Sequence, residues 1–218
     1  TGHCSEVVVA STWNPNCALL LGESVGKEGA TIGGTGWYAP GINIHRSAMG
    51  GRNFEYYSED PLISGIMGAK TAEGTMKYGV YTYAKHFVLN DQETERRGIQ
   101  VWTNEQALRE IYLKPFELYV KSGYGLGIMS SFNRIGNCWT GGSEALCTDV
   151  LRTEWGFHGV VVTDYMEPNI MKMSLGLRAQ NDLCLHRNTL NDAYSVYLEA
   201  NYDGAYLMRR ACKNILYA

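Results

Sequence analysis

Short apolar runs that alternate with longer amphipathic segments constrain this chain more than any other feature of its sequence. The clearest run, GVVVTDY at residues 159–165, has no polar alternation, which is typical of a strand buried on both faces of a parallel sheet. Similar runs recur along the chain. We therefore expect six strands, at residues 6–11, 36–44, 80–87, 125–132, 159–165 and 182–186.

Helix signals separate the expected strands. Asn14 and Asp60 are favoured capping residues, and each is followed by proline, which suits the first helical position. Thr103 and Gln106 form a capping box at the start of a third helix, in which Pro115 should produce a kink. The expected helices cover residues 15–30, 61–78, 103–123, 143–155 and 190–217.

This alternation of strands and helices predicts a parallel sheet with right-handed crossovers, either open or closed into a barrel. An open sheet that binds nucleotides would need a G-x-G-x-x-G turn between a strand and a helix, or a Walker loop, and neither occurs. We therefore expect an α/β fold of the (β/α)8 TIM-like barrel type. Because a closed barrel needs eight strands, we expect an incomplete barrel that forms a single domain over residues 1–218.

Composition excludes several classes of partner. The chain has 19 basic and 22 acidic residues, a net charge of −3 and no basic stripe, so nucleic acid is not an expected partner. It has no apolar run long enough for a membrane span and no signal-peptide pattern at its start. Its six cysteines lack the spacing of zinc ligands, and we expect them to be buried free thiols in a reducing compartment. We expect no metal or other cofactor.

Polar residues follow several of the expected strands at the point where each strand ends. Asp164 follows GVVVT, Lys85 and His86 follow VYTYA, and Arg52 lies in the loop after the second strand. In a barrel, catalytic groups collect at the C-terminal face of the strands, so we expect these side chains to converge. One carboxylate among cations suits a neutral, hydroxyl-rich ligand, because the cations keep it ionised and donate hydrogen bonds to hydroxyls.

Each of these residues also has a structural interpretation. Asp164 could cap a following turn, because aspartate is a favoured N-cap residue. His86 could be a buried core histidine with Lys85 as its solvated neighbour, although two polar residues that end an apolar strand favour a functional role. Arg52 could be held in an ion pair by nearby acids such as Glu55.

Four motifs strongly resemble the barrel domain of family 3 glycoside hydrolases. They are GGRNFEYYSEDP (50–61), AKHF (84–87), MSSFN (129–133) and EWGFHGVVVTDY (154–165). Each motif alone is weak, but four in this order and spacing are specific, and the resemblance covers nearly the whole chain. It implies a retaining exo-acting hydrolase, in which a glycosyl-enzyme forms and water then releases the sugar with the help of a second carboxyl group.

The resemblance also implies roles for individual residues. Asp164 matches the nucleophile, and Arg52, Lys85 and His86 match the residues that bind hydroxyls of the −1 sugar. Further expected substrate contacts are Met129 and Tyr165, and additional candidates are Arg96, Arg97 and Phe132. The two arginines are expected either to line the entrance or to pair with neighbouring glutamates, and Met129 and Phe132 are expected in the pocket wall.

Two parts of the family pattern have no match in this chain. The first barrel strands, which carry an aspartate for the distal hydroxyls, lie before Thr1 in that pattern. The acid/base carboxylate, which commonly comes from a second α/β domain, is also unmatched. We therefore expect a fragment whose partner is the missing domain of the same enzyme, and whose activity alone is weak or absent.

The substrate class follows from one motif. The family branch that acts on N-acetylglucosamine has K-H-F-P-G-x-G, whereas this chain has KHFVLNDQETERRG, which favours a β-glucosidase that releases terminal β-D-glucose. Phe132 stands where many β-glucosidases have tyrosine, so one hydrogen bond to the sugar or nucleophile is expected to be absent. Alternatives are β-xylosidase specificity and a non-catalytic sugar-binding fragment. We expect a cytoplasmic bacterial protein, with secretion as the alternative.

Overall fold

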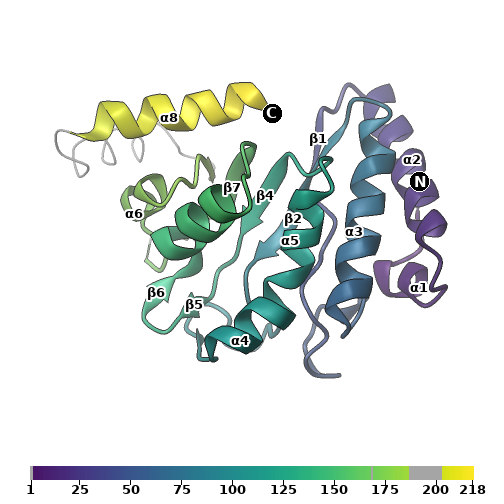
Figure 1. Cartoon of the computed structure of the whole chain (residues 1–218), viewed down its shortest axis with the longest axis horizontal. Helices are drawn as coiled ribbons and strands as arrows, with labels where there is room; N and C mark the ends of the chain where they lie inside the picture. Colours follow the sequence, from purple (N-terminus) through teal and green to yellow (C-terminus); the bar gives the residue numbers. More distant parts are fainter. Residues whose placement is uncertain (1, 168, 187–202) are drawn as a thin grey trace.

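The structure is a computed structural model, and it describes residues 2–167, 169–186 and 203–218 (Figure 1). The α-helices are α1 (Glu6–Ala10), α2 (Pro15–Thr31), α3 (Pro61–Met76), α4 (Glu105–Ala107), α5 (Lys114–Lys121), α6 (Met173–Arg178) and α8 (Gly204–Tyr217). Two short 3-10 helices, η1 (Asn53–Glu55) and η3 (Thr140–Gly142), and two π-type helices, η2 (Leu108–Tyr112) and η4 (Ala145–Glu154), complete the helical segments. The strands are β1 (Gly36–Trp37), β2 (Tyr81–Phe87), β3 (Gln100–Val101), β4 (Gly127–Ser130), β5 (Arg134–Ile135), β6 (Cys138–Trp139), β7 (Val160–Tyr165) and β8 (Leu183–Leu185).

Five parallel strands form the central sheet in the order β1-β2-β4-β7-β8. Spatial order follows chain order, and helical segments connect neighbouring strands, so the carboxyl ends of the strands lie at one edge of the sheet. Within the part of the chain that the structure describes, β1 and β8 are unpaired edges, and the sheet forms half of a barrel (Figure 1). The predicted α/β, barrel-type fold is confirmed, and its incomplete state agrees with the expectation.

The first predicted strand is wrong, because residues 6–11 form helix α1 and its C-cap. Three consecutive valines have no periodicity, so a pattern this short does not separate a strand from a buried helical turn. In the structure, Val9 and Ala10 are buried in the main core. The other five predicted strands correspond to the five strands of the central sheet.

The predicted helix starts are confirmed at two of three places. Asn14 caps α2 and Asp60 caps α3, each through a side-chain oxygen that accepts backbone N–H bonds. The third start is wrong by one residue, because the Asn104 side chain reaches the third helical N–H and caps α4. The helical segment that starts with α4 ends at Tyr112, and α5 begins at Lys114 with Pro115 in its first turn. The sequence predicted a kink at this proline. The last predicted helix is present as α8, and its part over residues 190–202 lies outside the described residues.

Helices α2 and α3 pack closely through glycines (Figure 1). A Cβ atom on Gly22 would lie 2.2 Å from the carbonyl oxygen of Thr71, and one on Gly74 would lie 2.3 Å from the carbonyl oxygen of Leu19. These separations are below van der Waals contact, so any side chain at either position would push the helices apart. The absence of side chains thus lets α2 lie directly against α3.

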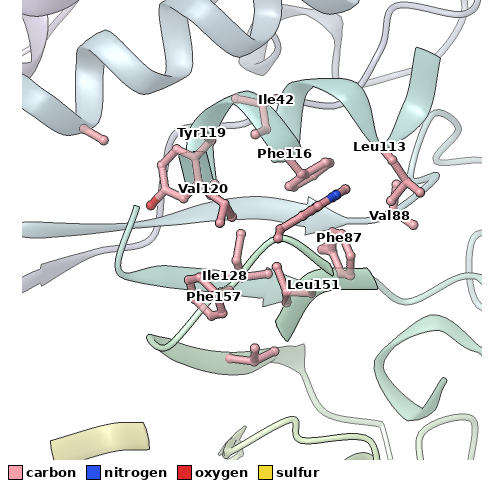
Figure 2. Close-up of a cluster of buried hydrophobic side chains, with 14 of the residues drawn as sticks. Ile42, Phe87, Val88, Leu113, Phe116, Tyr119, Val120, Ile128, Leu151 and Phe157 are labelled. Carbon is pink, nitrogen blue, oxygen red and sulfur yellow. The ribbon is translucent and has the colours of Figure 1, made fainter. Parts of the chain in front are cut away.

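The main hydrophobic core lies between the sheet and the helices that cover it (Figure 2). Phe116 of α5 meets Phe87 of β2 edge to face, with ring centroids 5.2 Å apart. Ile128 of β4 and Leu151 of η4 are also fully buried beside them. Each such side chain contributes about 1.5–3 kcal/mol through burial. This core holds β2 and β4 in register, and their polar carboxyl ends are thereby positioned.

Candidate active site

The end of β2 and the end of β7 bring a histidine and an aspartate together. His86 lies near the end of β2, and Asp164 lies near the end of β7, with β4 between the two strands (Figure 1). The His86 Nε2 atom lies 3.4 Å from Asp164 Oδ2. The expected convergence of these two residues is therefore present in the structure.

Asp164 is held within β7 and is largely buried, with its side chain 16% exposed. Its Oδ1 atom accepts a hydrogen bond from the Tyr165 backbone N–H at 2.7 Å, and α6 begins only at Met173, so Asp164 does not cap a helix. Burial raises the pKa of Asp164 above its usual value, against the opposing effects of the Tyr165 N–H and of Arg52, Arg96 and Lys85. The expectation that cations hold this pKa low is wrong, because desolvation outweighs them.

Glu55 joins the two cations that were expected to bind sugar. Oxygen atoms of the Glu55 carboxylate lie 2.6 Å from Lys85 Nζ, 2.8 Å from Arg52 Nε and 2.7 Å from Arg52 Nη2. Burial raises the pKa of Glu55, but the hydrogen bonds and charges of Lys85 and Arg52 outweigh burial, and the net pKa lies below its usual value. Arg52 is therefore in an ion pair, as the structural interpretation held, and the pair lies within the site. Lys85 is not a solvated neighbour, since its side chain is only 14% exposed.

His86 is fully buried and bonded on both its ring and its backbone. Its Nδ1 atom lies 3.1 Å from the Tyr56 hydroxyl, and its backbone N–H and carbonyl both bond the Asn43 side-chain amide. Burial, with the nearby positive charges of Arg52 and Lys85, holds the pKa of His86 well below its usual value. The imidazole is therefore neutral, and the prediction that it acts as one of several cations is wrong.

The two adjacent arginines differ in position. Arg96 Nη1 lies 2.8 Å from a Glu93 oxygen, and its guanidinium lies over the Phe132 ring, 4.4 Å from the centroid. Arg97 is exposed and pairs with Glu167 at 2.7 Å. The expected pairing with a neighbouring glutamate holds for Arg96, whereas the partner of Arg97 is the distant Glu167. Arg96 also lies close enough to Asp164 and His86 to affect their pKa values, so it belongs to the site.

Met129 and Tyr165 lie in contrasting surroundings. Met129 is buried in β4, aligned with Lys85 of β2 and Val162 of β7, and packs with the apolar side chains below the site. Tyr165 is 46% exposed, and its ring centroid lies 5.9 Å from that of His186. Phe132 is buried in a second apolar cluster and, as a phenylalanine, offers no hydroxyl. Met129 and Phe132 are thus buried apolar side chains whose place in a pocket wall stays a prediction, and Tyr165 presents an accessible aromatic face.

Three polar residues of the site, Tyr56, Asn90 and Glu6, were missed by sequence reasoning, and Glu93 was expected only as a partner of the adjacent arginines. Tyr56 and Asn90 bond to each other beside His86, and Glu93 approaches Arg52 at 3.6 Å as well as binding Arg96. Glu6 accepts the Gly41 backbone N–H at 3.0 Å, and burial raises its pKa well above the usual value. Tyr56 lies inside the GGRNFEYYSEDP motif, which could have drawn attention to it. Glu6 was assigned to a strand, and that assignment gave no indication that its carboxyl group bonds the Gly41 backbone.

Among the described residues, no further site is formed by metal ligands, by a membrane-spanning helix or by paired cysteines. In the described ranges, no cluster of three or more His, Cys, Asp or Glu side chains is suited to a metal ion. No described helix is both long and apolar enough to cross a membrane. All six cysteines are free thiols, and three of them (Cys4, Cys138 and Cys212) are exposed, which contradicts the expectation that they are buried.

The arrangement combines the Asp164 carboxylate with several hydrogen-bond donors at the end of a parallel sheet. Arg52, Lys85 and Arg96 carry charged donors, and neutral His86 carries one ring N–H. Such donors bind hydroxyl groups, while the carboxylate can form a covalent bond to an electrophilic carbon. The geometry therefore suits covalent chemistry on a polyhydroxylated ligand.

Comparisons with known proteins give a consistent result. The sequence model described as "Glycosyl hydrolase family 3 N terminal domain" matches residues 2–205. A β-glucosidase from Ruminococcus albus is 39% identical over 184 residues, which cover 81% of this chain and 19% of that protein. An exo-α-(1→6)-L-arabinopyranosidase from Bifidobacterium longum is 41% identical over 157 residues, 72% of this chain and 21% of that protein.

Solved structures agree with these sequence relatives. β-Glucosidase 3B from Thermotoga neapolitana in complex with glucose superposes with a TM-score of 0.91 at 36% identity, over 100% of this chain and 31% of that one. A β-glucosidase from Bifidobacterium adolescentis superposes with a TM-score of 0.91 at 33% identity, over 98% of this chain and 31% of that one. The chain thus spans about a fifth of the length of the curated relatives it matches and about a third of these structures.

Proposed function

Because this chain belongs to glycoside hydrolase family 3, we propose that it supplies the nucleophile and the sugar-binding groups of a retaining, exo-acting β-glucosidase. The observation that carries the proposal is the convergence of Asp164 with His86, Lys85 and Arg52 at the carboxyl edge of the sheet. The names of the relatives and the glucose bound to a similar solved structure support glucose as the sugar.

In the proposed reaction, a carboxylate oxygen of Asp164 attacks the anomeric carbon as the glycosidic C–O bond breaks. The leaving alcohol takes a proton from a second carboxyl group, and a glycosyl-aspartate forms; water then attacks the same carbon and frees Asp164. The Tyr165 N–H holds Oδ1 of Asp164, which orients the carboxylate. Asp164 must be ionised to attack, and the positive charges of Arg52, Arg96 and Lys85 favour that form against the effect of burial.

We propose that the second carboxyl group lies outside these residues. The site holds three other carboxyl groups. Glu55 and Glu93 are each ion-paired with cations, and Glu6, whose pKa burial raises, is held by the Gly41 backbone N–H at 3.0 Å. The pKa of Glu55 is lowered, whereas a general acid needs a raised pKa. A further domain that provides the acid/base group, together with strands that complete the barrel, would then make up the active enzyme. Both are expectations for the complete enzyme.

Three alternatives to the β-glucosidase proposal remain: two other sugars as substrate and a non-catalytic role. The relative named exo-α-(1→6)-L-arabinopyranosidase favours a pentopyranose as a second candidate substrate. Release of xylose would likewise need a site that accepts a ring without a hydroxymethyl group. A non-catalytic sugar-binding role would fit a chain that functions without an acid/base carboxyl group. All three make predictions that differ from those of the β-glucosidase proposal in one labelling experiment.

The test is labelling with an activated 2-deoxy-2-fluoro-β-glucoside, followed by intact-protein mass spectrometry and peptide mapping. We expect a fluoroglucosyl adduct on Asp164, and no adduct in the Asp164→Asn variant, which should also lose turnover while it stays folded. The matching fluoro-xyloside and fluoro-arabinopyranoside give the order of preference among sugars. Labelling at another residue, or wild-type turnover in Asp164→Asn, would contradict the assignment of the nucleophile.

The experiment is run on this chain and on the complete enzyme. Labelling in both would mean that the described residues already form a competent site. Labelling of the complete enzyme alone would mean that the additional strands or domain complete it. Absence of labelling in both, with sugar binding retained, would support the non-catalytic alternative.

A further inference from the structure

Three buried side chains form a hydrogen-bonded chain that ends beside the candidate nucleophile. Asn90 Nδ2 lies 3.2 Å from the Tyr56 hydroxyl, and that hydroxyl lies 3.1 Å from His86 Nδ1. The other ring nitrogen of His86, Nε2, lies 3.4 Å from Asp164 Oδ2. Asn90, Tyr56 and His86 are each only 1–2% exposed, so solvent does not compete for these bonds.

The orientation of the Asn90 amide is determined by its second neighbour. Asn90 Nδ2 also lies 3.3 Å from Glu93 Oε1. If the amide were turned over, its carbonyl oxygen would face this carboxylate oxygen with no hydrogen between them. An amide nitrogen must therefore occupy the position between Glu93 and Tyr56, and Asn90 acts as a donor to the Tyr56 oxygen.

The direction of the next hydrogen bond follows from this orientation. The Tyr56 oxygen accepts from Asn90, and its own hydrogen then needs an acceptor. Among the described residues, His86 Nδ1 is the only acceptor within hydrogen-bond distance of that hydroxyl. Burial raises the pKa of Tyr56 above its usual value, so the hydroxyl keeps its proton. The Tyr56 hydroxyl therefore donates its hydrogen bond to His86 Nδ1, and an acceptor nitrogen carries no proton of its own.

We propose that Asn90 and Tyr56 are positioning residues that fix the tautomer of His86, so that its Nε2–H faces Asp164 and the sugar hydroxyl beside it. A neutral imidazole has one N–H, and the hydrogen bond at one nitrogen decides which nitrogen carries it. The relay directs a single donor toward the reaction centre without adding a charge there. This proposal rests on the proposed glycosidase function for the role of the donor, but the tautomer itself is independent of catalysis.

The test is the protonation state of each His86 ring nitrogen, measured by long-range ¹H–¹⁵N correlation in the intact protein with ¹⁵N-labelled histidine. The His86 signals are assigned by their absence in His86→Gln. We expect an unprotonated Nδ1 and a protonated Nε2 in the wild type. The same tautomer should persist in Asp164→Asn, because the relay and not the carboxylate charge determines it.

Removal of the Tyr56 hydroxyl should release this constraint. In Tyr56→Phe combined with Asp164→Asn, we expect the Nδ1–H tautomer to become populated. The matched control is Tyr57→Phe combined with Asp164→Asn. Tyr57 is equally buried, but its hydroxyl bonds Thr71 in α3, so His86 should be unchanged. In otherwise wild-type enzyme, Tyr56→Phe should lower kcat/KM for a β-glucoside about tenfold, as expected for an unpaired buried polar group.

A protonated Nδ1 in the wild type or in Asp164→Asn would overturn the proposal, and so would an unchanged tautomer after removal of the Tyr56 hydroxyl. The wild-type measurement decides the matter even if the double variant does not fold. Failure of the glycosidase proposal gives a different result, since labelling at Asp164 would then be absent while the His86 tautomer stayed as described.

Discussion

Replacement of Glu55 by glutamine should weaken both the fold and the site. Its carboxylate oxygens lie 2.6 Å from Lys85 Nζ and 2.7 and 2.8 Å from two Arg52 nitrogens. Loss of one partner costs about 3–5 kcal/mol for a fully buried ion pair and about 0–1 kcal/mol for an exposed one. The three side chains are 14–21% exposed. We therefore expect Glu55→Gln to lower the free energy of unfolding by about 2 kcal/mol.

The loss should depend on pH in a defined direction. Burial raises the pKa of Glu55, but Lys85 and Arg52 outweigh it, so the folded-state pKa lies below the unfolded value. A carboxyl group of this kind stabilises the fold fully above its unfolded pKa of about 4.3, and loses that contribution as the pH falls through the lower folded-state pKa. The difference between wild type and Glu55→Gln should be constant near neutral pH and should shrink below about pH 4.3.

The assay is urea denaturation followed by circular dichroism, with linear extrapolation at several pH values. Glu59→Gln is the matched control, because Glu59 is exposed, lies four residues along the same segment and forms none of the ion pairs found among the described residues. A stability loss in Glu55→Gln no larger than in Glu59→Gln at pH 7 would refute the reasoning. So would a difference that grows as the pH falls. Weaker glucose binding is the expected companion effect, since both sugar-binding cations lose their anchor.

Two further predictions concern the fold away from the site. Asp182→Ala should lower the free energy of unfolding by about 3–5 kcal/mol, because it leaves the buried Arg152 guanidinium, 2.5 Å away, without its charge partner. Urea denaturation measures this loss. In the control, replacement of the exposed Asp149 by alanine, the free energy of unfolding should change by less than about 0.5 kcal/mol. Gly22→Ala should lower the melting temperature despite the better helix propensity of alanine, because its Cβ would meet the α3 backbone at 2.2 Å, whereas Gly29→Ala, whose Cβ would meet a valine side chain at 3.3 Å, should not.

Local patterns correctly predicted most of the fold. The buried strand at 160–165 and the strand at 81–87 were visible as apolar runs, and the proline that follows Asn14 and Asp60 marked two helix starts. These signals act within a few residues, so tertiary contacts do not change them. The error at residues 6–11 has the same origin, because an apolar run of four residues has no period that distinguishes a strand from a helical turn.

The sequence by itself determined which residues stand at the carboxyl ends of the strands, since in a parallel sheet those ends must share one edge. Asp164, Lys85 and His86 were identifiable in this way. Only the tertiary structure decided how they interact. Glu55 reaches Lys85 across 30 positions of the chain, and Tyr56 reaches His86 across the same separation. Such pairings depend on how loops pack against one another, and the charge of each group depends on its burial. The neutral state of His86 and the raised pKa of Asp164 therefore follow from the fold and not from residue type.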